Sequence, residues 1–117
     1  MNKKRTSIGW VLAVLTSIMP LMGAYGKFFN PEMVSAMGRY GLGDWTKIIG
    51  LGELVTVVLF LIPKTHRFGL LLISAHMGGA IVVHMSHDEP FLMQTLVLLL
   101  AWTTGFIRHK DFYFKNT

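Results

Sequence analysis

The sequence contains no cysteine and is poor in charged residues. Of its 117 residues, 15% are charged and 52% are hydrophobic, whereas a soluble domain carries about 25% charged residues. The lack of cysteine excludes disulfides, thiol redox chemistry and thiolate metal sites formed by this chain. The lack of charge leaves too few polar side chains to cover the apolar ones, which favours a protein that faces lipid.

The few charged residues are mostly basic, which gives the chain a formal net charge of +5 and a pI near 9.8. In a soluble protein, this charge would suggest nucleic-acid binding. Here the basic residues cluster at the ends of apolar blocks, a pattern typical of membrane anchoring. We therefore expect the lipid bilayer, and no nucleic acid, among the partners of this chain.

Four long apolar blocks cover residues 8–25, 46–62, 68–85 and 91–107. Each is roughly 17–18 residues long, near the lower limit for a helix that spans a hydrocarbon core of about 30 Å. The blocks lack the alternation of a β-barrel, so helices are the elements that satisfy their backbone in lipid. We predict an all-α membrane protein, with residues 1–117 as one domain folded into an antiparallel bundle of four transmembrane helices. A soluble bundle is the alternative, but it would lack a polar shell.

The first connection, residues 26–45, is long enough to hold an element of its own. Within it, Asn30 is a typical N-cap, Pro31 suits the first helical position, and Glu32 favours the positive end of a helix. Apolar residues follow before glycines break the pattern. We predict a short interfacial helix that lies over one mouth of the bundle.

Lysine and arginine are distributed unevenly about the blocks. One side of the membrane would hold Lys3, Lys4, Arg5, Lys64, Arg67, Arg108, Lys110 and Lys115, whereas the other would hold Lys27, Arg39 and Lys47. Because cytoplasmic loops are enriched in these residues, we predict that both termini lie in the cytoplasm. A cleaved signal peptide is the alternative interpretation of the first block, but the small and weakly polar face of that block favours a permanent helix.

Glu53 is an acid inside an apolar block, roughly 10 Å below the outer surface at about 1.5 Å per residue. A carboxyl group at that depth is costly unless it faces the interior and finds a partner. Lys27 lies on the small-residue face of the first block, at the outer mouth. Glu53 is thus a proton site, a ligand anchor or a charge partner, unless it is only a polar clasp between helices. Lys27 is either a pocket residue or a snorkelling interfacial lysine.

Polar residues of the third and fourth blocks extend this interior. His76 lies at a depth close to that of Glu53, and His84 follows on the same helix face toward the outer mouth. Gln94 shares a face of the fourth block with small residues. We predict one pocket, open to the outer face, with these candidate ligand-binding residues: Lys27, Glu53, His76, His84 and Gln94. The few histidines are not a specific metal signal, so we predict no metal site, and no catalytic residue is identified.

Four short motifs carry a resemblance to a known family. They are Gly23-Ala24-Tyr25-Gly26-Lys27, Ile49-Gly50-Leu51-Gly52-Glu53-Leu54, Leu61-Ile62-Pro63-Lys64-Thr65 and Gly78-Gly79-Ala80-Ile81-Val82-Val83-His84. By their order and spacing, nearly the whole chain resembles the DoxX-like family of small four-helix integral membrane proteins. Lys27, Glu53 and His84 fall at motif positions.

The resemblance implies a multi-pass protein of the bacterial cytoplasmic (inner) membrane, in some members associated with quinone-linked or other redox complexes. It thereby implies a subunit or accessory factor with a membrane or soluble oxidoreductase partner. The sequence has no nucleotide-binding loop and no haem-attachment motif, so we expect no covalently bound cofactor, and a quinone is the candidate cofactor. Whether the chain is itself an enzyme, its substrate and its oligomeric state are left open by the sequence.

Two other functions remain open. Small multidrug resistance transporters are similar in size and carry one membrane-embedded glutamate, so a proton-coupled small-molecule transporter is one alternative. Their glutamate lies in the first helix, whereas Glu53 lies in the second. The other alternative is a membrane assembly or chaperone factor without chemistry of its own, because a eukaryotic branch of the resembled family assists receptor assembly.

Overall fold

The computed structural model describes residues 3–109, and every element within that range is helical. Lys110 and Lys115 of the basic set lie outside the described residues. The helices are α1 (Lys3–Phe29), α2 (Pro31–Arg39), α3 (Thr46–Leu61), α4 (His66–Ser86) and α5 (Leu92–Arg108), with short 3-10 turns at Gly43–Trp45 and Pro63–Thr65. The all-α prediction is confirmed for residues 3–109.

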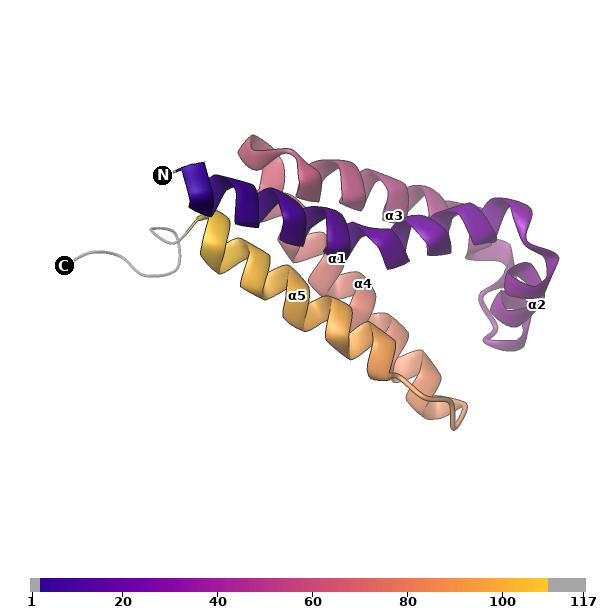
Figure 1. The fold of residues 1–117 in the computed structure, drawn as a ribbon. Helices are drawn as coiled ribbons and strands as arrows, with labels where there is room; N and C mark the ends of the chain where they lie inside the picture. Colours follow the sequence, from indigo (N-terminus) through magenta and orange to yellow (C-terminus); the bar gives the residue numbers. More distant parts are fainter. Residues whose placement is uncertain (1–2, 110–117) are drawn as a thin grey trace.

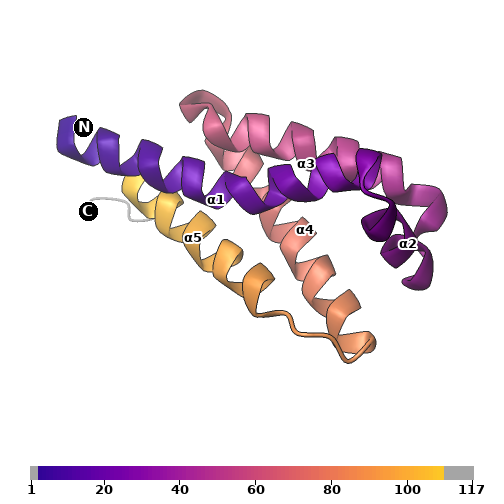
Figure 2. The same cartoon turned by 45° about the vertical axis from the view of Figure 1, so that its right-hand side comes forward.

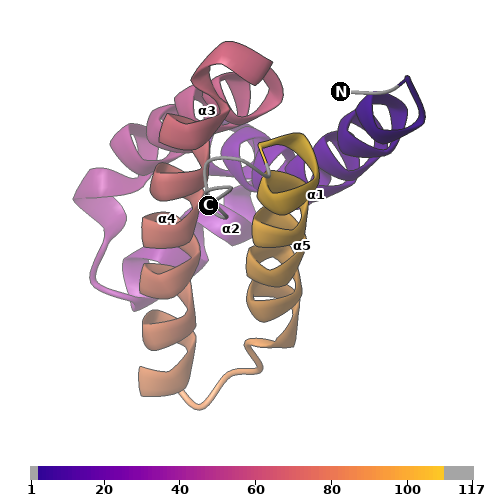
Figure 3. The ribbon, with the colours of Figure 1, turned by 90° about the vertical axis from the view of Figure 1, so that its left-hand side faces the viewer.

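The four long helices pack in a closed order, in which α1 and α4 each contact both α3 and α5. α1 begins and α5 ends at one end of the bundle, and α2 lies at the opposite end (Figure 1). α4 and α5 run side by side (Figure 3). Toward the α2 end, α4 and α5 run away from α1 and α3, and α2 lies where the two pairs separate (Figure 2). The helices are therefore close at one end of the bundle and spread at the other.

The first helix is longer than the apolar block that predicts it. α1 spans Lys3–Phe29, whereas the block covers residues 8–25; the other three long helices agree with their blocks to within about two residues. The early start has a tertiary cause, because Arg5 donates from Nε to Ile107 O (2.5 Å) and from Nη2 to Phe106 O (3.0 Å). Arg5 thus holds the first turn of α1 against the last turn of α5.

The short helix predicted in the first connection is present as α2. Asn30 accepts a hydrogen bond from the backbone N–H of Glu32 (3.0 Å), and Pro31 occupies the first helical position. These contacts are the N-cap arrangement that the sequence predicts. The helix ends after Arg39, and Gly41 adopts φ +78°, a backbone conformation that glycine accepts readily.

The bundle has an apolar exterior, and its interior combines an apolar core around Phe60, Ile73 and Ala101 with many polar side chains. Its buried residues include Thr16, Ser17, Thr46, Glu53, Thr56, His66, Gln94, Thr104 and Arg108, whereas Val11, Val14, Leu51, Leu71, Val82 and Leu99 are among those with large exposed apolar side chains. Large apolar patches are unfavourable in water and favourable in lipid. α1 and the segment Pro63–Ser86 are long and apolar enough to cross a membrane, and α5 is a shorter apolar helix. These features indicate a membrane protein.

The end where α1 begins and α5 ends, which we call the basic end, is closed by Arg108. This side chain is 5% exposed, and its Nη1 donates to the carbonyls of Phe60 (3.0 Å) and Leu61 (2.9 Å) in the last turn of α3. Its guanidinium carbon lies 4.5 Å from the centre of the Trp10 ring. The last carbonyls of a helix have no intrahelical partner and carry partial negative charge, so a buried arginine is favourable there.

Close backbone packing adds to this closure of the basic end. A Cβ added at Gly69 would lie 2.3 Å from the backbone nitrogen of Phe60, so α3 and α4 meet at a position that only glycine allows. The His66 ring, which is fully buried, packs against Phe60 and His109. Burial lowers the pKa of His109, and the charge of Arg108 lowers it further.

Candidate functional site

A cavity of about 740 Å³ lies at the α2 end of the bundle. α1, α3, α4 and α5 all contribute to its walls, and residues of α2 cover it. Each of the predicted pocket residues lines this cavity: Lys27, Glu53, His76, His84 and Gln94. The volume falls in the range of small-molecule sites, which is about 300–1,000 Å³.

Glu53 joins three helices inside the cavity. Its side chain is 3% exposed; Oε1 accepts a hydrogen bond from Lys27 Nζ of α1, and Oε2 lies 3.1 Å from His76 Nε2 of α4. Glu53 therefore faces the interior, as the cost of a carboxyl group in lipid predicts, and it lies within reach of both Lys27 and His76. Because both carboxylate oxygens have partners, the group meets the condition under which a buried acid is tolerated.

Gly23 leaves the space that this carboxylate occupies. A Cβ added at Gly23 would lie 2.8 Å from Glu53 Oε2, closer than non-bonded atoms approach. A Cβ added at Gly50 would lie 3.1 Å from Lys27 Cβ, so α1 and α3 are also close where the lysine stem passes. Glycines in two of the family-like motifs thus have a packing reason, because they let the ion pair form between closely spaced helices.

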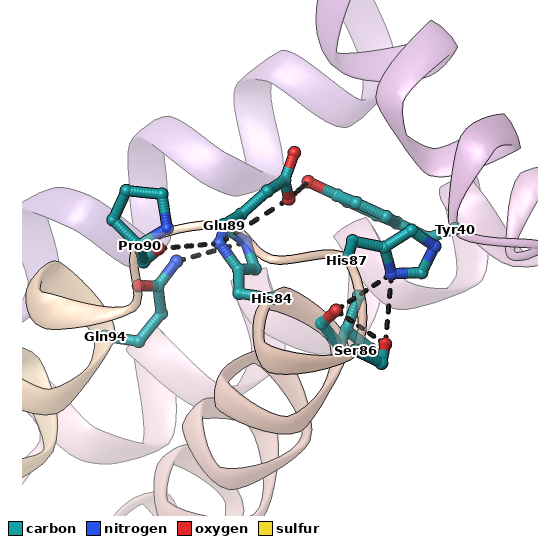
Figure 4. Close-up of polar contacts among 8 residues, drawn as sticks. Tyr40, His84, Ser86, His87, Glu89, Pro90 and Gln94 are labelled. Carbon is teal, nitrogen blue, oxygen red and sulfur yellow. Dashed lines mark hydrogen bonds and ion pairs between the residues drawn. The ribbon is translucent and has the colours of Figure 1, made fainter.

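His84 and Gln94 form a second polar group, nearer the turn between α4 and α5 (Figure 4). His84 Nδ1 lies 3.0 Å from Pro90 O, and His84 Nε2 lies 3.3 Å from Gln94 Nε2. A carbonyl can only accept, so His84 donates from Nδ1 and accepts from the Gln94 amide at Nε2. The five predicted residues thus belong to two clusters, a deep one around Glu53 and one beside the turn.

Two residues of the site were missed by sequence reasoning. Tyr40, at the end of α2, donates its phenol proton to the Glu89 carboxylate, and its ring packs 5.8 Å from His84 and 4.9 Å from His87, centre to centre. This hydrogen bond raises the pKa of Tyr40, and burial raises it further. No sequence pattern signals the pair, because Tyr40 and Glu89 lie in different connections and meet only in the folded chain.

The remaining lining is apolar or balanced in charge. Methionines contribute flexible, polarizable surface that adapts to the shape of a ligand, and those of the cavity are Met19, Met33, Met37 and Met77. Lys27 is paired with Glu53, and the rim carries both Glu32 and Arg39. Such a site suits a neutral, largely apolar molecule with a polar head that can receive hydrogen bonds.

Comparison with known sequences gave one finding. The sequence model described as the DoxX-like family matches residues 11–106, from the first half of α1 to the last turn of α5. No curated protein and no solved structure matches the chain. The matched span includes both polar clusters and α2.

Proposed function

The chain belongs to the DoxX-like family, and from this premise we propose that it is a quinone-binding protein of the bacterial cytoplasmic membrane. In this proposal it crosses the membrane four times. It acts as a subunit or accessory factor of a membrane-associated redox system. The observation that carries the proposal is the cavity around the buried Glu53 and its partners Lys27 and His76.

The lengths and surfaces of the helices support four membrane crossings. α3 has 16 residues and α5 has 17, so each is roughly 24–26 Å long. Both pack along the longer α1 and α4, and both expose apolar side chains such as Leu51 and Leu99. A slightly short helix is tolerated where the bilayer thins or flanking residues snorkel.

The charge distribution supports cytoplasmic termini. Lys3, Lys4, Arg5, Lys64, Arg67 and Arg108 belong to helix ends or turns at the basic end. The described acids Glu32, Asp44, Asp88 and Glu89 belong to the connections at the α2 end. Positive residues favour the cytoplasmic side, which would open the cavity toward the outer side.

A quinone head group fits the chemistry of the cavity. Its ring is neutral and flat, and its two carbonyl oxygens accept hydrogen bonds. Lys27 has ammonium protons beyond the one given to Glu53, and these can be donated to a quinone oxygen. Methionine walls suit the ring, and the lipid-facing exterior suits an isoprenoid tail. In this proposal, electrons pass between the bound quinone and a partner oxidoreductase.

The test is direct binding to purified protein in lipid nanodiscs, with a benzoquinone that carries a short alkyl tail as the probe. We expect saturable binding, weakened about tenfold or more by Lys27→Met, which keeps the stem and removes the hydrogen-bond donor. Lys47→Met is the matched control, because Lys47 lies outside the cavity. Equal affinities for both variants, or no saturable binding by the native chain, would contradict the proposal.

A proton-coupled transporter is the second candidate, and one observation favours it. Glu53 is a buried carboxylate with a histidine partner beside a cavity, the kind of group that exchanges protons in membrane transporters. In sealed liposomes, substrate-dependent proton flux that Glu53→Gln abolishes would favour this candidate. Recovery of a stoichiometric oxidoreductase with the protein from native membrane would favour the redox system. If an unassembled membrane protein co-purifies with the chain instead, the result would favour an assembly factor without chemistry of its own.

A further inference from the structure

The cavity is covered by one face of α2. Met33, Ala36, Met37 and Tyr40 line it, and their spacing places them on one side of a helix. The opposite side, which includes Val34 and Ser35, is exposed. α2 is therefore an amphipathic cover rather than a fifth wall helix.

α2 is held to the two sides of the cavity mouth by different means. At its start the backbone continues from α1, with Asn30 N–H donating to Gly26 O (2.9 Å) and Val34 N–H donating to Asn30 O (3.0 Å). At its end, the Tyr40 phenol bonds to Glu89 of the turn between α4 and α5, and the Tyr40 ring packs on His84 and His87. The backbone therefore ties α2 to α1 at its start and, through residues 41–45, to α3 at its end, whereas Tyr40 holds it to the α4–α5 side of the mouth by side-chain contacts.

The turn that receives Tyr40 is shaped to present Glu89. Asp88 has φ 54°, which is uncommon for a residue other than glycine, and Glu89 N–H donates to His84 O (2.9 Å). The Glu89 side chain is 35% exposed, so solvent can compete for its contact with Tyr40. His84 Nδ1 lies 3.8 Å from Glu89 Oε1, and His84 also lines the cavity. The Tyr40–Glu89 contact therefore adjoins the cavity lining through His84 (Figure 4).

We propose that α2 is a lid over the cavity and that the Tyr40–Glu89 hydrogen bond is its latch. Release of Tyr40 lets α2 move away from the turn between α4 and α5 while it stays joined to α1 and α3, and the mouth then admits a ligand. This inference rests on the proposed function only in taking the cavity as the ligand site. Its test measures access to the cavity without a quinone, so failure of quinone binding and failure of the lid are distinguishable.

The absence of cysteine allows single reporter thiols. Ala80→Cys places one in the cavity wall, Ser35→Cys places one on the exposed side of α2, and Ala101→Cys places one in the fully buried core. Each variant is treated in detergent with a bulky, water-soluble maleimide. The maleimide concentration is kept low, so that modification is slower than closing of the lid and its rate reports the fraction of molecules with an open lid. In the native background we expect the thiol at position 80 to react much more slowly than the thiol at position 35.

The latch is tested by Tyr40→Phe, which keeps the ring and removes the hydroxyl. We expect this variant to raise the modification rate at position 80 about tenfold, which corresponds to about 1.4 kcal/mol. Rates at positions 35 and 101 should not change. Glu89→Gln should act in the same direction, because a neutral amide accepts a weaker hydrogen bond than a carboxylate. Tyr25→Phe is the matched control, since Tyr25 is 66% exposed and lies outside the cavity.

Three results would overturn the lid. One is native reactivity at position 80 equal to that at position 35, which would mean that the mouth is already open. Another is an unchanged rate at position 80 in both Tyr40→Phe and Glu89→Gln. The last is an equal rise at positions 80 and 101, which would mean that the substitutions loosen the whole bundle rather than the mouth.

Discussion

The two ends of this bundle are closed by different means. At the basic end, arginine side chains bind the last carbonyls of neighbouring helices, and α3 and α4 touch through their backbones at Gly69. At the α2 end, the helices separate around a cavity, and one short helix lies over it, held to the α4–α5 turn by side-chain contacts. The basic residues Arg5 and Arg108 thus have a structural role, apart from the orientation that we propose. They fasten one end, which leaves the other free to hold a ligand site.

The largest expected effect concerns the deep cluster of the α2 end. Glu53→Gln removes the charge that Lys27 faces, and Lys27 is only 11% exposed. We expect a loss of about 3–5 kcal/mol in stability, because a buried cation is left unpaired. Thermal unfolding in detergent measures this, with Glu32→Gln at the cavity rim as the control. If the variant is less stable but binds quinone with native affinity, the Lys27–Glu53–His76 cluster has a structural role only.

A somewhat smaller loss is expected at the basic end. Arg108→Met keeps an apolar stem but removes the donor to Phe60 O and Leu61 O. We expect about 2–3 kcal/mol of destabilisation, because buried carbonyls lose a charged partner. Quinone affinity should not change, since Arg108 lies outside the cavity. If Arg108→Met instead lowers the affinity for quinone without lowering the melting temperature, the basic end and the cavity are coupled rather than independent.

Gly23 tests how closely α1 approaches the carboxylate of Glu53 at the α2 end. Gly23→Ala places a methyl group 2.8 Å from Glu53 Oε2, so the carboxylate must shift. We expect about 1–2 kcal/mol of destabilisation and weaker quinone binding. Gly52→Ala is the matched control, because nothing lies within 4 Å of its added Cβ. That control should be neutral or slightly stabilising, since alanine favours helix more than glycine. Equal behaviour of the two variants would contradict the close approach at Gly23.

The smallest effect is a pH dependence at the basic end. Burial and Arg108 lower the pKa of His109 in the folded chain, so its contribution to stability is complete above about pH 6.5, the usual histidine value. As the pH falls below that value, the unfolded chain takes up a proton first and stability decreases. Melting curves between pH 8 and pH 5 should show a shallower decrease for His109→Asn than for the native chain.

Local signals in the sequence determined much of this molecule. The apolar blocks predicted the long helices because each block satisfies its own backbone, and the Asn30–Pro31–Glu32 cap predicted α2. The cost of a carboxyl group in lipid predicted that Glu53 would face the interior. The longer start of α1 was not predictable, since it depends on Arg5 reaching the end of α5. These predictions worked where the physical cause lies within one helix.

Only the tertiary structure decided which helix ends meet. Tyr40 and Glu89 are 49 positions apart, and Arg108 lies 48 positions from Phe60. Helix periodicity predicts which face a residue occupies, but not which residue of another helix lies opposite. That choice depends on how closely the helices pack along their length. Close packing at Gly69 and separation around the cavity together leave a mouth for α2 to cover.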